Sequence, residues 1–130
     1  MRFPIPTRYS AYSALVLRVG LAAVILWFGA NQLMSPEMWT AWVPEWTAAL
    51  GFSPENVVLL NGIFEVAAGA LLLLGVLTRW VAILLFLHLL LIVFEIGMTA
   101  IGVRDFGLAV AFLALALDDR EQKLALAPRT

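Results

Sequence analysis

The chain has 130 residues, of which 63% are hydrophobic and 13% charged, and its net charge at pH 7 is −1. Soluble domains carry about 25% charged residues, so a chain this poor in charge cannot cover its surface with polar groups and is expected in a lipid bilayer. The near-neutral charge offers no basic surface to a nucleic-acid partner. The absence of cysteine excludes disulfides, iron–sulfur ligation and a cysteine nucleophile in this chain.

Four segments are apolar enough to span a bilayer, which takes about 20 such residues. They cover about residues 12–33, 56–77, 80–97 and 101–117. Proline and small polar residues lie between them, as they do at helix ends: Ser35-Pro36, Ser53-Pro54 and Thr78-Arg79. We therefore predict an all-α fold, a polytopic membrane four-helix bundle that forms a single domain over residues 1–130.

Lysine and arginine predict the orientation of this bundle, because they gather on the cytoplasmic side of membrane proteins. One side holds Arg2, Arg8, Arg79, Arg120, Lys123 and Arg129. The segment 34–55 has neither residue, and only Arg104 falls on its side. We expect both termini in the cytoplasm, the segment 34–55 outside, and the chain in the cell (inner) membrane as a multi-pass protein.

The first span contains Arg18 and ends at Asn31 and Gln32. Its apolar stretch is longer than the 7–15 residues of a signal-peptide core and includes an arginine, which argues against cleavage. Arg18 lies about 9 Å from the cytoplasmic end, at a rise of ~1.5 Å per residue, and its long side chain can extend to the headgroups.

The segment 34–55 is rich in tryptophan. Trp39, Trp42 and Trp46 are three and four residues apart, which would place them on one face of a short helix, with an interruption at Pro44. Indole rings favour the headgroup region, so this outer loop is expected to lie on the membrane surface. The alternative is a lid over a site that opens outward.

Ionisable residues interrupt the second and third spans. Glu65 lies roughly 13 Å below the outer end of its span, and His88 roughly 12 Å above the cytoplasmic end of the next. In a core ~30 Å thick these levels differ by only a few ångströms. Glu95 follows His88 by seven residues, two helical turns, and shares its face.

The last span opens with Arg104 and Asp105. Ionisable groups inside a membrane are costly and pair with one another in the bundle interior. We therefore expect a polar cluster in the outer half of the bundle, with Arg104 paired to Glu95 or Glu65. Its members would be Asn31, Gln32, Glu65, His88, Glu95, Arg104 and Asp105. No paired histidine spacing predicts a metal site.

The order of motifs along the chain resembles that of the DoxX family of small four-helix membrane proteins. The shared stretches are LRVGLAAVILWFGANQL, NGIFEVAAGALLLLGVLTRWVAILLFLHLL and IGVRDFGLAVAFLALAL, within residues 14–117. The motifs are Arg18 with Gly29, Glu65 before a glycine-rich half-helix, Gly75-x-x-Thr78-Arg79, and Arg104-Asp105. Many members carry a lysine where this chain has Gln32. The resemblance implies a membrane subunit, in a family named after a component of a thiosulfate:quinone oxidoreductase and with redox partners in several members, but it does not imply a single reaction.

Two functions from different classes follow. One is a subunit that binds a quinone headgroup, or passes protons to it, through His88, Glu65 and Glu95. The other is a non-catalytic scaffold that packs against partner membrane proteins or further copies of itself, with the polar residues only joining the helices. A solute carrier is less well supported, because no span is broken by proline at its middle.

Overall fold

The computed structural model describes residues 6–118, and this part of the chain is helical without strands. Four helices are long and apolar enough to cross a membrane: α2 (Ser13–Met34), α4 (Pro54–Leu74), α5 (Thr78–Ile96) and α6 (Ala100–Leu117). Short elements accompany them: α1 (Thr7–Ser10), the 3₁₀ helix η1 (Pro36–Trp42) and α3 (Trp46–Ala49). The predicted all-α class is confirmed. Arg2, Arg120, Lys123 and Arg129, used above for the orientation, lie outside the described residues.

Helix α4 ends three residues before its predicted limit, and Gly75 is the cause. Gly75 adopts a left-handed conformation with φ of 73°. The N–H of Val76 donates to the carbonyl of Leu71, and the N–H of Gly75 donates to that of Leu72, which is the Schellman arrangement. Nη1 of Arg18 donates to the carbonyls of Leu72 and Leu73 at 2.7 and 2.8 Å. Arg18 thus caps a neighbouring helix.

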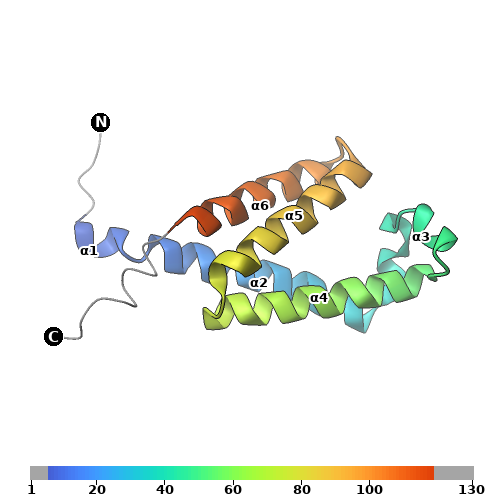
Figure 1. Cartoon of the computed structure of the whole chain (residues 1–130), viewed down its shortest axis with the longest axis horizontal. Coiled ribbons are helices and arrows are strands. Elements are labelled where there is room, and N and C mark those ends of the chain that lie inside the picture. Colours follow the sequence, from blue (N-terminus) through green and yellow to red (C-terminus); the bar gives the residue numbers. More distant parts are fainter. Residues whose placement is uncertain (1–5, 119–130) are drawn as a thin grey trace.

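The four spans form two pairs: α2 packs along α4, and α5 packs along α6. Figure 1 shows the α5–α6 pair running at an angle to the α2–α4 pair, so that the pairs diverge toward the end that carries α3. Glycines allow the close approach of α2 and α4. A Cβ on Gly29 would lie 2.9 Å from the backbone nitrogen of Val66, and one on Gly69 would lie 2.8 Å from Cγ of Leu26.

The apolar core lies in one half of the bundle, where α2 and α5 begin and α4 and α6 end. Leu72, Leu85 and Phe112 are completely buried there. We call this the closed half, and the opposite half, which carries η1 and α3, the cavity half. The outer faces are apolar as well: on α5, Leu91 and Phe94 are 67% and 86% exposed. Such faces are suited to lipid, and the protein is therefore a multi-pass membrane protein in contact with the bilayer.

Candidate functional site

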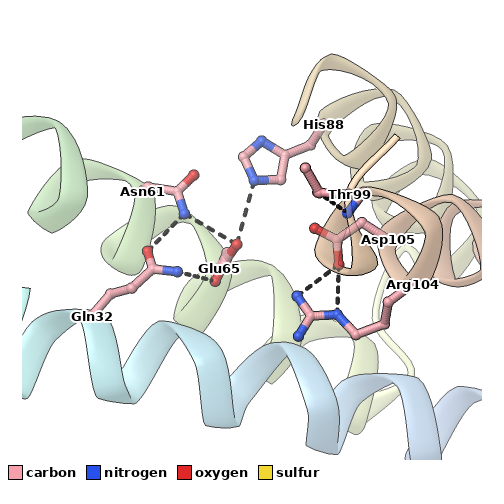
Figure 2. A network of polar contacts seen from close by, with 8 residues as sticks. Gln32, Asn61, Glu65, His88, Thr99, Arg104 and Asp105 are labelled. Carbon is pink, nitrogen blue, oxygen red and sulfur yellow. Dashed lines mark hydrogen bonds and ion pairs between the residues drawn. The ribbon is translucent and has the colours of Figure 1, made fainter. Parts of the chain in front are cut away.

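A polar network lies in the cavity half, with the carboxylate of Glu65 at its centre (Figure 2). Nε2 of Gln32 donates to Oε2 of Glu65 at 3.1 Å, and Nδ2 of Asn61 donates to Oε1 at 3.1 Å. Nδ2 of Asn61 also donates to Oε1 of Gln32 at 2.7 Å. Glu65 is only 3% exposed and Gln32 only 7%. The three side chains therefore form a closed ring of hydrogen bonds between α2 and α4.

His88 of α5 approaches Glu65 on the side away from Gln32 (Figure 2). Its Nε2 lies 3.4 Å from Oε1 of Glu65, within the range of an ion pair. The geometry is not that of a hydrogen bond, and Nε2 is buried without a hydrogen-bond partner among the described residues. The ring also packs against Phe64, with 4.8 Å between centroids. His88 thus joins the second helix pair to the network on the first.

Close packing of α2 and α4 is what brings this network together. A Cβ on Gly62 would lie 3.1 Å from Cβ of Gln32, and a Cβ on Gly29 would lie 3.0 Å from Cβ of Glu65. Larger residues at these glycines would push the two helices apart. Because Asn61 precedes Glu65 by one helical turn, both side chains lie on the face that meets Gln32.

A second polar pair lies on α6. Nε and Nη2 of Arg104 lie 2.9 and 2.8 Å from Oδ1 of Asp105, which is buried, whereas the Arg104 side chain is 45% exposed. Cζ of Arg104 lies 4.6 Å from the ring centroid of Phe28, so the guanidinium stacks on an aromatic face of α2. Thr99 fixes the start of α6, because its Oγ1 accepts a hydrogen bond from the N–H of Gly102 at 3.0 Å.

A cavity of about 430 Å³ lies between the two helix pairs. Most of its wall is apolar, with side chains such as Ile25, Leu89 and Ile92. The polar part consists of Gln32, Asn61, Glu65, Arg104 and Asp105. A cavity of this size and composition matches the sites that hold small ligands in proteins, which are mainly apolar with a few polar groups.

The connection between α2 and α4 covers this cavity. Trp39 and Trp42 of η1 line it, together with Val43 and Pro44. Trp39 packs edge-to-face on Phe28, with 5.7 Å between centroids. Trp46, on α3, donates from Nε1 to Oε1 of Glu95 at 3.1 Å. Pro44 lies between η1 and α3, so Trp46 is not on one continuous helix with Trp39 and Trp42.

The structure brings together most of the predicted cluster, but three of its members have partners other than those predicted. Arg104 pairs with Asp105, its neighbour in the chain, so the predicted pairing with Glu65 or Glu95 is wrong. Glu95 is exposed and bonds Trp46, away from the network. Asn31 turns back on its own helix and donates from Nδ2 to the carbonyl of Trp27 at 2.7 Å. Because adjacent residues of a helix point in different directions, Asn31 does not share the face on which Gln32 meets Glu65.

Two residues of the site were not predicted from the sequence. Asn61 completes the hydrogen-bond ring, and the available signal was its spacing of four residues from Glu65. Phe28 contacts Arg104 and Trp39 from the middle of an apolar run, where nothing in the sequence distinguishes it from lipid-facing neighbours.

A comparison with known families gives one result. The DoxX family matches residues 13–98, which contain α2, α4 and α5 with the network of Gln32, Asn61, Glu65 and His88. Helix α6, with Arg104 and Asp105, lies beyond the matched residues. No curated protein and no solved structure gives a match. On the strength of this match over most of its length, the chain belongs to the DoxX family.

Proposed function

We propose that this protein is a membrane subunit that binds the headgroup of a lipid-soluble quinone in the cavity between its helix pairs. The observation that carries this proposal is the cavity itself, because its apolar wall includes five polar side chains on three different helices. An amphipathic ring with polar substituents suits such a wall better than an ion or a sugar does.

The polar residues have separable roles in this proposal. Arg104 is held by Asp105 and Phe28, lines the cavity and has a side chain that is 45% exposed, which suits it to donate to a quinone carbonyl. Gln32 and Asn61 hold the carboxylate of Glu65 at the cavity wall. Reduction of a quinone consumes protons as well as electrons, and in this proposal Glu65, which lines the cavity, passes a proton to the headgroup.

His88 acts from behind Glu65 in this account, because it contacts the carboxylate but does not line the cavity. Proton exchange with Glu65 requires a small movement that closes the 3.4 Å gap into a hydrogen bond, and His88 does not exchange protons with the ligand directly. Glu95 has no part in the relay. The electrons come from a partner protein, since this chain has no cysteine and only one histidine with which to hold a redox metal. We further propose cytoplasmic termini in an inner membrane, which would open the cavity half toward the outer face.

Binding of decylubiquinone to the protein in lipid nanodiscs tests the proposal, with quenching of tryptophan fluorescence as the measure, because Trp27, Trp39 and Trp42 line the cavity. Gln32→Ala should weaken binding about tenfold, because it removes one hydrogen bond to Glu65 and one from Asn61. The matched control is Asn31→Ala, the adjacent residue, which bonds only its own helix and should leave binding unchanged. Equal affinities of wild type and Gln32→Ala, or no binding by wild type, would refute the proposal.

A non-catalytic scaffold is the second candidate, and two exposed glycines favour it. A Cβ on Gly20 of α2 or Gly107 of α6 would have nothing within 4 Å, so another helix can approach closely at either position. If the scaffold function holds, Gly20→Leu or Gly107→Leu should release a partner that co-purifies from native membranes in fixed stoichiometry. A wild-type protein that purifies without partners would count against it.

A further inference from the structure

The connection between α2 and α4 is attached mainly to the first helix pair. It is continuous with both helices, and η1 packs on α2 and α4 while α3 packs on α4. Trp39 adds an edge-to-face contact with Phe28 of α2. Any movement of the second helix pair relative to the first would therefore leave the connection in place on α2 and α4.

A single polar contact ties this connection to α5. Nε1 of Trp46 donates to Oε1 of Glu95 at 3.1 Å, and no other hydrogen bond between the connection and the second helix pair is found within residues 6–118. Trp46 is 57% exposed, and Glu95 is exposed in the last turn of α5. Water and lipid headgroups can compete for both groups, so this bond opens far more readily than the buried ring around Glu65.

This contact lies beside the cavity. Trp42, Val43 and Pro44, just before Trp46 in the chain, line the cavity on one side, and Ile92 and Ile96, which flank Glu95, line it on the other. The Trp46–Glu95 bond therefore joins the two walls by connecting α3 to the last turn of α5. Apart from this bond, the residues that line the cavity on its two sides here are apolar, which suits the passage of a molecule that arrives from the bilayer.

We propose that the Trp46–Glu95 hydrogen bond is a latch that holds the connection against α5 and controls the entry of an amphipathic, lipid-soluble molecule into the cavity. The carboxylate gives the indole N–H an acceptor within the protein, in place of a lipid headgroup. Breaking the latch frees the connection to separate from α5 without disturbing Gln32, Asn61 or Glu65. The identity of the entering molecule as a quinone rests on the proposed function above, whereas the latch does not.

Hydrogen exchange in nanodiscs tests the latch without any ligand. Trp46→Phe and Glu95→Ala should each raise the exchange rate of backbone amides in residues 36–49 by about threefold to tenfold, the effect of one lost hydrogen bond. Glu95→Gln keeps an acceptor oxygen and should restore the wild-type rate. Trp80→Phe controls for the loss of an exposed indole, because Trp80 lies at the other end of α5 and is 69% exposed. Unchanged exchange in both Trp46→Phe and Glu95→Ala would overturn the latch.

Ligand kinetics then test control of entry. Stopped-flow quenching by decylubiquinone should show association and dissociation rates raised by the same factor in Trp46→Phe, with the Kd unchanged. In the double variant Trp46→Cys, Glu95→Cys, the two cysteines are the only ones in the chain, and a bis-maleimide link between them should slow both rates at least tenfold. If the variants show faster amide hydrogen exchange but unaltered association and dissociation rates of decylubiquinone, the control of entry would be overturned. Faster exchange without any decylubiquinone binding by wild type would support the latch and refute the quinone.

Discussion

The two halves of this bundle are built from the same four helices but on opposite plans. In the closed half, completely buried side chains such as Leu72, Leu85 and Phe112 fill the space between the helix pairs. In the cavity half the pairs diverge around a space of about 430 Å³, and the buried polar residues of the described chain gather there: Gln32, Thr47, Glu65 and Asp105. The apolar core and the polar cavity thus lie at different ends of the same helices.

The difference explains how a small membrane protein can keep ionisable groups in its interior. Hydrogen bonding between apolar helices in lipid is worth only about 1 kcal/mol for each bond, so the network by itself would hold the bundle weakly. The tight apolar packing of the closed half holds the helices in register, so the polar ring is not needed to hold the bundle together.

The largest expected effect comes from truncating a core side chain in the closed half. Phe112→Ala should lower the free energy of unfolding by about 3–5 kcal/mol, because it empties a fully buried site that the surrounding helices cannot refill. Unfolding by SDS titration in mixed micelles measures the loss. Phe106→Ala, on the same helix but 54% exposed, is the control and should cost less than about 1 kcal/mol. Similar losses in both variants would mean that the core is not where the structure places it.

A second, smaller effect concerns the cap at the end of α4. Arg18→Gln should lower the free energy of unfolding by about 1.5–3 kcal/mol, because the guanidinium donates two hydrogen bonds to the carbonyls of Leu72 and Leu73. The loss should be accompanied by faster amide exchange in the last turn of α4. Arg8→Gln removes the same charge from an exposed position and should be nearly neutral. Equal effects of the two substitutions would show that charge, not the cap, is responsible.

The smallest effect concerns the close packing of α2 and α4 at Gly29. Gly29→Ala should lower the free energy of unfolding by about 1–3 kcal/mol, because the new methyl group would overlap the backbone at Val66 and displace Glu65. It should therefore also weaken decylubiquinone binding. Gly20→Ala, on the same helix with open space at its Cβ, should be neutral or stabilising by less than about 1 kcal/mol. A Gly29→Ala variant with full stability and affinity would contradict the close packing of α2 and α4.

The sequence was sufficient to predict the helices and the common level of Glu65 and His88, which lie 3.4 Å apart, because both follow from apolar length and helical rise. It could not predict the partners of Arg104. Depth alone made Glu65 and Glu95 acceptable partners, but the choice of Asp105 depends on side-chain geometry at the start of α6. Likewise, Glu95 shares a helical stripe with His88, yet the divergence of the helix pairs leaves it at the surface beside Trp46. Such divergence is a tertiary property that periodicity does not encode.

The most direct test of the central claim is a structure of the protein crystallised from a lipidic mesophase containing decylubiquinone. We predict density for the headgroup between Gln32, Asn61 and Arg104, with the hydrogen-bond ring around Glu65 intact. A cavity filled by side chains alone, or a headgroup bound anywhere else on the protein, would contradict the account.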